Sequence, residues 1–337
     1  MVIAIDAMGG DLFPKNPVSG AVKAVNENDI SVILVGDEIA LKKELDRHRY
    51  KTNKVEIVHA PQIVEMDETI SSALRKKKNS SMWYCYEMHK KGDVQGVVSA
   101  GNSGAMLAIG RFVMKMIPHV HRPCISAILP SMKGNVLLVD AGANTDCSTR
   151  QLAQFAVLGH VYMKNFFSVP SPRIGLLNVG SEAGKGDEIR KETYGILKES
   201  SLNFIGNIEG EDFFNGDIDV VVTDGFAGNI LLKSVQAAAS FLKNTLKQEI
   251  QKSLLTQAGA FLLKSSLERL QKKTDYAEFG GAPLLGLAGN SVICHGKSNP
   301  QAIQFGIEFA QWAADVHMAT EMEERMEEFK QLLTLDI

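Results

Sequence analysis

The sequence predicts an α/β fold with a doubly wound, mainly parallel sheet. Short apolar runs rich in Val, Ile and Leu alternate along the chain with longer segments of helical period. Strands buried on both faces have this composition, because helices cover both sides of a parallel sheet. Strands are expected at residues 2–5, 32–35, 55–58, 96–99, 136–139, 174–177, 219–222 and 291–294. Helices are expected between them, at residues 21–25, 107–116, 152–162 and 230–246.

Length and composition favour one packed domain. The chain has 337 residues, of which 45% are hydrophobic and 22% charged, so it can bury a large core and is not disordered as a whole. No Pro/Ser-rich linker divides the sequence, and we expect a single α/β domain over residues 1–337. The formal net charge of −3 argues against a surface built to hold nucleic acid.

The cysteines and the apolar stretches indicate a cytoplasmic protein. Cys85, Cys124, Cys147 and Cys294 lie far apart with no CxxC pair, so neither a disulfide framework nor a zinc site is expected. The N-terminal MVIAID lacks the basic segment of a signal peptide. No apolar stretch reaches the roughly 18 residues of a membrane-spanning helix. We therefore expect reduced thiols and a chain that does not cross the membrane.

Segments rich in Gly, Asn, Ser and Asp follow six of the expected strands. They read DAMGGD at 6–11, SAGNSGA at 99–105, DAGAN at 140–144, NVGSEAGKG at 178–186, TDGFAGN at 223–229 and HGKS at 295–298. Open α/β sheets bind ligands at the carboxyl ends of their strands, where glycines let backbone N–H groups approach an anion. The candidate phosphate- and acyl-binding residues are Asp6, Gly9, Gly10, Asn102, Ser103, Gly104, Asn144 and Asn178. The alternative is a set of tight turns without a site.

The same loops exclude the common nucleotide-binding signatures. A dinucleotide site needs GxGxxG after the first strand, where this chain has acidic residues beside the glycines of DAMGGD. No GxxxxGK[ST] motif occurs. The loop carboxylates could hold Mg²⁺, although capping of helices and hydrogen bonds to loop amides are commoner roles for such acids. These acids are Asp6, Asp11, Asp140, Asp146 and Asp224. We expect no metal and no cofactor.

These motifs resemble the bacterial phosphate acyltransferase (PlsX) family. The loops above, together with FGGAPLLG at 279–286, keep the motif order and spacing of that family from Met1 through residue 315. The resemblance implies an α/β/α sandwich like that of phosphotransacetylases and isopropylmalate dehydrogenases. It implies transfer of an acyl group from acyl carrier protein to inorganic phosphate, giving acyl phosphate and free carrier protein for phospholipid synthesis. It also implies a homodimer, attachment to the inner face of the cell membrane, and a downstream glycerol-3-phosphate acyltransferase that uses acyl phosphate.

This reaction makes modest demands on the protein. Phosphate is already an anionic nucleophile at neutral pH, and a thiol of pKa near 8.5 leaves from a thioester without obligatory protonation. Direct attack by phosphate needs oriented reactants and hydrogen bonds to the developing oxyanion. Lys185, Asn229 and Asp224 are the candidate catalytic residues, and Lys297 is a further candidate for positive charge at phosphate.

Three alternatives remain open for the chemistry. A covalent route would need an activated thiol, but Cys294 and His295 are neighbours on a strand and point to opposite faces, so they are not expected to form a dyad. A transacylase that uses acyl-CoA would need pockets for adenine and pyrophosphate. A membrane scaffold without activity would bind lipid and partners only.

Arg75, Lys76, Lys77 and Lys78 form a run of four cations in a chain of net negative charge. Such a run could steer the encounter with acidic acyl carrier protein. Arg75, Lys77 and Lys78 are therefore the candidate carrier-protein contacts. The alternative is a solvated helix face.

Residues 243–275 are expected to form an amphipathic helical protrusion. Seven basic and three acidic residues lie in this segment, and a change in the phase of its apolar positions predicts two helices that break near Gly259. Apolar side chains near the tip could enter an anionic lipid interface. The candidate membrane contacts are Leu254, Leu255, Phe261, Leu262 and Leu263. A dimer contact or a pair of helices that covers the core is the alternative.

Overall fold

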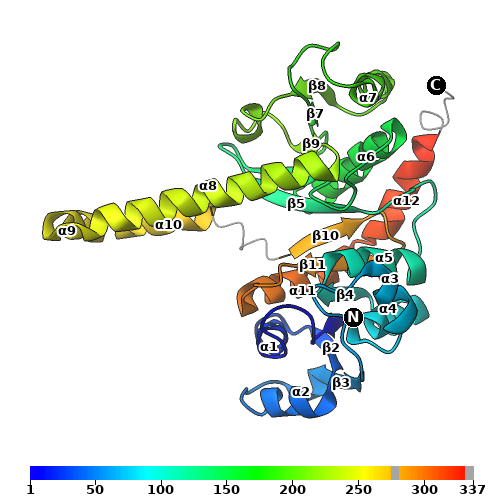
Figure 1. Ribbon diagram of the computed structural model, residues 1–337, viewed down its shortest axis with the longest axis vertical. Helices are drawn as coiled ribbons and strands as arrows, with labels where there is room; N and C mark the ends of the chain where they lie inside the picture. Colours follow the sequence, from blue (N-terminus) through cyan, green and yellow to red (C-terminus); the bar gives the residue numbers. More distant parts are fainter. Residues whose placement is uncertain (275–280, 331–337) are drawn as a thin grey trace.

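The computed structural model describes residues 1–274 and 281–330. Figure 1 shows two lobes joined by one sheet, with an arm of helices that leaves the body between them. The arm contains the 243–275 segment except residue 275, which lies outside the described residues. The first two residues of the 279–286 motif also lie outside them.

The strands confirm the α/β fold class. They are β1 (Val2–Asp6), β2 (Ser31–Gly36), β3 (Val55–His59), β4 (Gly96–Ser99), β5 (Cys124–Pro130), β6 (Asn135–Val139), β7 (Ile174–Leu177), β8 (Phe204–Ile208), β9 (Val220–Val222), β10 (Gly281–Leu285) and β11 (Asn290–Cys294). All eight expected strands are present. The sequence does not predict β5, β8 and β10, because each contains Pro, Gly or Asn, which are typical of turns rather than of strands.

The sheet is mostly parallel but changes direction in its middle. Its strand order is β3-β2-β1-β4-β11-β10-β5-β6-β9-β7-β8 in the described part of the chain. Seven of the ten strand pairs are parallel, and the three antiparallel pairs all involve β5 or β10. The strands β6, β9 and β7 therefore run opposite to β1, β4 and β11. We call the part with β1–β4 and β11 the first lobe and the part with β6–β9 the second lobe.

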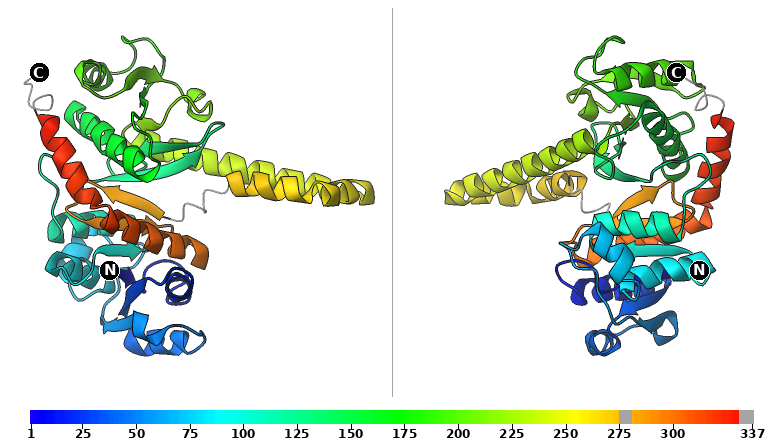
Figure 2. Two further views of the ribbon diagram at one scale, coloured as in Figure 1. Left: turned by 180° about the vertical axis from the view of Figure 1, so that it is seen from behind. Right: turned by 45° about the vertical axis from the view of Figure 1, so that its right-hand side comes forward.

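The helices account for most of the remaining chain. They are α1 (Lys15–Asn28), α2 (Glu38–Leu45), α3 (Ile70–Lys76), α4 (Ser81–Lys91), α5 (Ser103–Val113), α6 (Thr149–Phe166), α7 (Glu188–Glu199), α8 (Gly225–Gln251), α9 (Leu254–Leu262), α10 (Lys264–Thr274), α11 (Pro300–Asp315) and α12 (Met318–Glu328), with short 3₁₀ helices at Thr52–Lys54 and Asp212–Phe214. Figure 2 shows these helices on both sides of the sheet. The four expected helices are confirmed as parts of α1, α5, α6 and α8.

Alternate residues of the first-lobe strands enter two different cores. In β1, Ile3 and Ile5 pack into the core formed with α1 and α11, whereas Ala4 packs into the core formed with α4 and α5. In β2, Leu34 packs into the core with α1 and α11, and Val35 packs into the core with α4 and α5. Period-two alternation places successive side chains on opposite faces of a sheet. Both faces are buried, which explains why the interior positions of β1 and β2 are apolar.

The arm is built from three helices rather than two. Figures 1 and 2 show α8 extending away from the body, α9 at the tip and α10 returning beside α8. The break expected near Gly259 is wrong, since Gly259 lies inside α9. The chain breaks instead at Ser253, whose Oγ accepts the Thr256 N–H at 3.1 Å and caps α9, and again at Leu263. Within the two described ranges, no helix has the length and apolar content needed to cross a bilayer.

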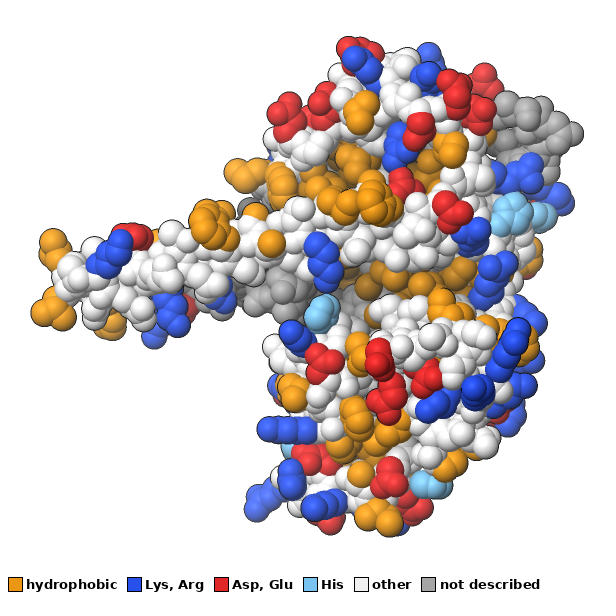
Figure 3. Space-filling model, in the orientation of Figure 1, with side chains coloured by type: hydrophobic (Ala, Val, Ile, Leu, Met, Phe, Trp, Pro, Cys, Tyr) orange, Lys and Arg blue, Asp and Glu red, His pale blue; other side chains and the backbone are white. Residues whose placement is uncertain are grey.

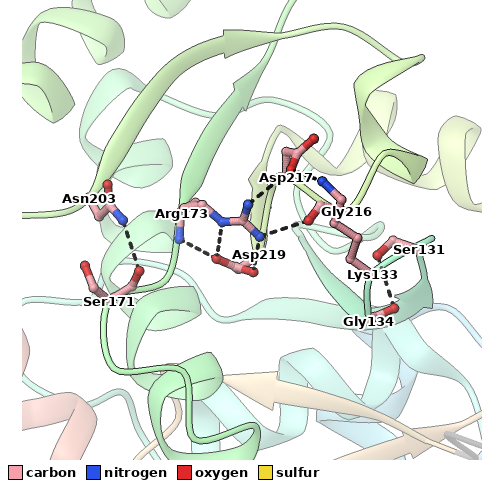
Figure 4. Close-up of polar contacts among 9 residues, drawn as sticks. All are labelled: Ser131, Lys133, Gly134, Ser171, Arg173, Asn203, Gly216, Asp217 and Asp219. Atoms are coloured by element: carbon pink, nitrogen blue, oxygen red, sulfur yellow. Dashed lines mark hydrogen bonds and ion pairs between the residues drawn. The ribbon is translucent and has the colours of Figure 1, made fainter.

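An Arg173 network ties together the amino ends of the second-lobe strands, at the edge away from their loops (Figure 4). Arg173 Nε and Nη2 each donate at 2.9 Å to one oxygen of Asp219, and Nη2 also donates to the Gly216 carbonyl at 3.0 Å. Lys133 in the β5–β6 turn pairs with Asp217 at 2.5 Å. The Asp219 carboxylate raises the pKa of Arg173, so the guanidinium stays charged. This network holds the start of β7 against the segment that leads into β9.

Candidate active site

Six loops that follow strands lie in two groups of three. β1, β4 and β11 are parallel neighbours, as are β6, β9 and β7, and the carboxyl ends of each set lie together. The loops are residues 7–14, 100–102 and 295–299 in the first group, and 140–148, 178–187 and 223–224 in the second. The sequence predicts one shared edge, but β5 and β10 reverse the strand direction between the groups. Because neighbouring strands are rotated by roughly 20–25°, the twist from β1 to β9 turns the second group back toward the first.

Asp6 is a buried brace at the base of the first loop group. Its Oδ1 accepts a hydrogen bond from Ser81 Oγ and its Oδ2 accepts one from Ser99 Oγ, both at 2.6 Å. Burial raises the pKa of Asp6, and the two hydroxyl donors oppose that rise. A Cβ at Gly9 would lie 2.8 Å from both Asp6 Oδ2 and Ser99 Oγ, so only glycine lets the loop close over the carboxylate. The carboxylate therefore positions the loop from inside and does not face the groove between the lobes.

Gly10 turns the chain toward the loop after β11. Its φ of 96° lies in the left-handed region that favours glycine. A Cβ at this position would lie 3.1 Å from the Gly296 carbonyl oxygen, and the N–H of the next residue, Asp11, donates to that oxygen at 2.8 Å. The loops after β1 and β11 are thus joined backbone to backbone.

The start of α5 completes the first loop group. Asn102 caps this helix, because its Oδ1 accepts the Ala105 N–H at 3.0 Å, and its Nδ2 donates to the Met66 carbonyl at 2.9 Å. Asn102 therefore fixes the helix start against the preceding loop. Ser103 is exposed and Gly104 is half-buried at the first two positions of α5, whose N–H groups have no acceptor within the helix.

Asp140 organises the first loop of the second group. It is fully buried and accepts five hydrogen bonds, including those from the N–H groups of Gly142, Ala143 and Asn144 at 3.0, 2.9 and 2.7 Å. Burial raises the pKa of Asp140, and these donors oppose the rise. Asn144 Nδ2 donates to Asp140 Oδ2 at 2.8 Å and to the Pro123 carbonyl at 2.9 Å. Asn144 thus holds the loop in shape instead of projecting into the groove.

Asn229 lies on α8 directly over this loop. A Cβ at Gly228 would collide with the Asp140 carbonyl oxygen, so a glycine lets α8 approach the loop closely. A Cβ at Gly142 would lie 3.4 Å from the Asn229 Cβ. Asn229 is exposed, and the structure records no hydrogen bond between its amide and another described residue. Its amide is available to a ligand.

Asp224 directs α8 out of the second loop group. Its Oδ1 caps the helix by accepting the Ala227 N–H at 2.9 Å, and its Oδ2 accepts a hydrogen bond from Arg190 Nη2 at 2.5 Å. Arg190 also donates to Asp187 Oδ2 at 2.6 Å and to the Leu177 carbonyl at 3.3 Å. One guanidinium therefore connects the end of β7 with the starts of α7 and α8. With both oxygens engaged, Asp224 has the geometry of a positioning residue rather than of a catalytic one.

Asn178 and Lys185 lie at the two ends of one loop. Asn178 Nδ2 donates to the Lys185 carbonyl at 3.0 Å, and its Oδ1 accepts the Val179 N–H at 2.8 Å. Asn178 therefore closes the loop. The Lys185 side chain is 51% exposed, and its Nζ lies 3.9 Å from Glu182 Oε1. An exposed pair at this distance is weak, so the ammonium group is available to an anion.

Basic residues of both lobes influence one histidine, because the charges of Lys233 on α8 and of Lys297 after β11 both act on His295. Lys233 lies on α8 one turn after Asn229. The side chain of His295 is exposed, but partial desolvation of its ring lowers its pKa, and the charge of Lys233 adds to this effect. Lys297 lowers that pKa further, and the Asp11 carboxylate opposes the effect. At the base of the arm, Figure 3 shows a basic side chain on the arm and, below it, a histidine and a further basic side chain on the first lobe.

The cysteines are not arranged for covalent catalysis. All four are free and buried. Burial raises the pKa of Cys294 to about 12, and its Sγ lies 3.9 Å from the Ala302 carbonyl, while His295 is exposed. No three His, Cys, Asp or Glu side chains within the described ranges lie together at metal-ligating spacing.

The candidate carrier-protein contacts lie at the end of α3. Arg75 and Lys78 are exposed, whereas Lys77 pairs with Glu68 at 3.3 Å. Lys78 Nζ lies 5.9 Å from the centroid of the Trp83 ring. Figure 3 shows Lys and Arg side chains gathered along the side of the first lobe that α3, α4 and α5 form.

The candidate membrane contacts are all at the tip of the arm. The exposed fractions of Leu254, Leu255, Phe261, Leu262 and Leu263 are 85, 83, 76, 83 and 57%. These side chains pack into none of the buried cores of the lobes.

Sequence reasoning misses two residues of this region. Arg190 belongs to no loop motif, since it lies three residues into the chain after the Asp187 cap. Lys233 stands four residues after Asn229, a spacing that places both on one face of a helix. That spacing is the signal that could have identified Lys233.

The fold is an α/β fold like that of phosphotransacetylases. A phosphotransacetylase from Streptococcus pyogenes superposes with a TM-score of 0.60 at 17% identity, covering 93% of this chain and 94% of that chain. A branched-chain phosphotransacylase from Enterococcus faecalis superposes with a TM-score of 0.58 at 14% identity, covering 93% of this chain and 98% of that chain. At such low identity, these likenesses define the fold alone.

Sequence comparison identifies the family. The family model described as "Fatty acid synthesis protein" matches residues 1–321. The phosphate acyltransferase of Trichlorobacter lovleyi is 44% identical over 328 residues, covering 97% of this chain and 95% of the relative. The phosphate acyltransferase of Geotalea daltonii is 42% identical over 337 residues, covering 99% of this chain and 97% of the relative. The chain belongs to the phosphate acyltransferase family and is an acyltransferase.

Proposed function

We propose that this acyltransferase converts acyl-[acyl carrier protein] and inorganic phosphate into acyl phosphate and free carrier protein, for phospholipid synthesis. A phosphate oxygen forms a bond to the thioester carbonyl carbon, the C–S bond breaks, and the leaving thiolate takes a proton from solvent. The observation that carries the proposal is the exposed Asn229 amide, which is held over the Asp140 loop with Lys233 one turn away on the same helix face.

Each candidate group has a role that fits this reaction. The Asn229 amide donates a hydrogen bond to the developing oxyanion, and the Lys185 ammonium attracts phosphate. Backbone N–H groups at Gly10, Ser103 and Gly104 are further donors for anionic oxygens, since two of them begin a helix. Preorganised donors of this kind stabilise the transition state without moving a proton. This set of groups supports direct attack better than a covalent intermediate, because the buried Cys294 thiol is held protonated.

The surface at α3 to α5 supports docking of the acidic carrier protein. Arg75 and Lys78 present unneutralised charge, and Phe112, whose ring neighbours the same Trp83 ring as Lys78, is 56% exposed. The Phe112 ring lies 5.9 Å from that of Trp83, and Lys115 Nζ lies 5.4 Å from the Phe112 centroid. Cations around an exposed aromatic ring suit an acidic partner, because charge steers the encounter and the ring supplies contact area.

The arm supports a homodimer and a peripheral membrane contact at different positions. On α8, Phe241, Leu242 and Leu246 are 68, 65 and 44% exposed and could pack against the arm of a second copy. At the tip, the five leucine and phenylalanine side chains named above suit the inner face of the cell membrane. A protein placed there could deliver acyl phosphate to a membrane-bound glycerol-3-phosphate acyltransferase.

The donor and the product are tested together. Purified protein is given acyl carrier protein and coenzyme A thioesters of the same acyl chain, each with and without phosphate, and acyl phosphate is measured by phosphorus NMR. We expect phosphate-dependent product from the carrier-protein thioester. If only the coenzyme A thioester gives product, the protein is a transacylase that uses acyl-CoA. Absence of any phosphate-dependent product would leave a binding scaffold.

A further inference from the structure

We propose that Met66 and Ile70 form the surface that receives the acyl chain of the substrate, beside the loops of the first group. Met66 lies shortly before α3 and Ile70 is the first residue of that helix. Neither is among the candidate residues named from the sequence. The inference rests on the proposed function and adds the apolar contacts that the acyl chain needs, because methylene groups are transferred favourably from water to an apolar surface.

Met66 lies against the loop that follows β11. A Cβ at Gly296 would lie 2.9 Å from Met66 Cε and 3.3 Å from Asp11 Oδ1. The N–H of Asp11 donates to the Gly296 carbonyl at 2.8 Å, so the loops after β1 and β11 meet at this glycine. Met66 is nevertheless 44% exposed and packs into none of the buried cores. It therefore presents apolar surface where the two loops join.

Ile70 lies against the start of α5. A Cβ at Gly104 would lie 3.5 Å from both Cγ1 and Cδ1 of Ile70. Gly104 is the second residue of α5, and the first N–H groups of a helix have no acceptor within it. Ile70 is 51% exposed and packs into none of the buried cores. An exposed apolar side chain thus adjoins the backbone donors proposed for anionic oxygens.

Asn102 holds these two positions relative to each other. Its Nδ2 donates to the carbonyl oxygens of Met66 and Glu68 at 2.9 and 3.0 Å, while its Oδ1 caps α5. The same Oδ1 would lie 3.4 Å from a Cβ at Gly104. One amide therefore fixes the segment between Met66 and Ile70 to the helix start. An acyl chain on this surface would be oriented relative to the donors for its reacting end, as efficient transfer requires.

The charges around Met66 identify the acyl chain as the occupant. Glu65 and Asp67, its two neighbours in the sequence, are both exposed. Like charges placed against an acidic carrier protein would repel it. A neutral hydrocarbon chain has no such conflict, and it is bonded to the thioester that the proposed function brings to these loops. The surface therefore suits the acyl chain and not the body of the carrier protein.

The apolar cavity between β10, β11, α11 and α12 does not offer the chain another place. Its volume is about 20 Å³, which suits one water molecule. Leu287 and Gly289, in the turn between β10 and β11, line it. The cavity thus lies at the amino end of β11, whereas the loops of the first group follow the carboxyl ends of their strands.

The test compares acyl chains of different length in matched variants. Met66→Ala with Ile70→Ala removes the proposed surface, and Met66→Leu with Ile70→Leu keeps it apolar. Ile39→Ala with Met132→Ala makes the same changes at exposed positions elsewhere. For each protein, kcat/KM is measured with hexadecanoyl- and butanoyl-[acyl carrier protein] at one phosphate concentration.

We expect the alanine pair at 66 and 70 to lower the ratio of the hexadecanoyl to the butanoyl kcat/KM about tenfold, since each methylene removed from water contributes about a factor of four. The leucine pair and the control pair should keep the ratio of wild type. If acyl phosphate is formed, an unchanged ratio in the folded alanine variant would overturn the inference and leave the proposed function standing. An equal loss with both chains would do the same and show a structural or carrier-protein contact. Single substitutions replace the pair if it does not fold.

Binding of a neutral thioester keeps the inference separate from the proposed function. Octanoyl-N-acetylcysteamine, which contains neither carrier protein nor coenzyme A, is titrated into wild type and the same variants by calorimetry without phosphate. If no acyl phosphate is formed, this titration decides. Binding that is about tenfold weaker in the alanine pair at 66 and 70 than in the control pair would support the surface. Equal or absent binding would overturn it.

Discussion

Arg190 Nη2 donates to Asp224 Oδ2 at 2.5 Å, while the other oxygen of Asp224 caps α8. Both side chains are less than one fifth exposed, with fractions of 18 and 16%. The start and direction of α8, and with them the position of Asn229, therefore depend on this pair. Asp224 serves the candidate site by orienting a helix.

Breaking this pair should lower activity through position. Asp224→Asn keeps an oxygen that can cap α8 but loses the charged partner of Arg190, and Arg190→Gln loses the same interaction from the other side. We expect each variant to lose about 1–2 kcal/mol of unfolding free energy, since a hydrogen bond between charged groups is worth roughly 1.5–3 kcal/mol before exposure is discounted. Both should reduce kcat/KM by a similar factor, about tenfold.

Denaturant unfolding and steady-state kinetics measure the two effects. If Asp224 acts directly on the substrate, Asp224→Asn abolishes turnover while Arg190→Gln keeps most of it. That difference between the two variants would refute the positioning role.

Removing the Asn229 amide should affect turnover more than removing the Lys185 ammonium. Asn229→Ala should lower kcat by about 10²–10³, as expected for loss of an oxyanion donor, with little change in melting temperature because the amide has no partner in the described structure. Lys185→Ala should lower kcat/KM about tenfold, because its charge is exposed. Asn244→Ala, an exposed residue farther along α8, is the matched control. Wild-type kcat in a folded Asn229→Ala variant would remove Asn229 from the mechanism.

The loops could be predicted from the sequence because each follows an apolar strand that is buried on both faces. The division of the loops into two groups could not be predicted, because it depends on the reversal of strand direction at β5 and β10. These two strands contain Ser, Pro or Gly, so their sequences do not resemble strands. The sequence identifies the Asp and Asn residues of the loop motifs, but it does not predict their structural roles, because these depend on hydrogen-bond partners far along the chain. Asp6 bonds to Ser81 and Ser99, and spacing along the sequence does not reveal such contacts.

The charge of the α3 end should control the encounter with acyl carrier protein. Changing Arg75, Lys77 and Lys78 together to Glu reverses three charges, so kcat/KM for the carrier-protein thioester should fall at low salt and its salt dependence should weaken. Stopped-flow binding at several salt concentrations measures the association rate. A control with Lys43, Lys164 and Lys198 changed to Glu alters the net charge equally, at exposed positions on α2, α6 and α7. Equal effects of the two triple variants would mean that net charge, not this surface, steers the carrier protein.

Charge placed at the tip of the arm should abolish lipid binding and spare catalysis. Each buried Leu or Phe contributes roughly 1.5–3 kcal/mol, so Leu254→Glu with Phe261→Glu removes two of the five apolar contacts and adds two negative charges that an anionic surface repels. We expect no sedimentation with anionic vesicles and normal turnover of soluble substrates. The control, Phe241→Glu with Leu242→Glu on α8, should keep vesicle binding but weaken the dimer in analytical ultracentrifugation. Loss of dimerisation by the tip variant would show that the tip is a subunit contact.

Direct attack by phosphate is tested most sharply in a single turnover. Enzyme is mixed with an equal amount of acyl-[acyl carrier protein] without phosphate, the free carrier thiol is followed, and phosphate is then added. The account predicts no thiol release before phosphate and one acyl phosphate per thiol released afterwards. A burst of thiol equal to the enzyme concentration before phosphate is added, or thiol release without acyl phosphate, would contradict it.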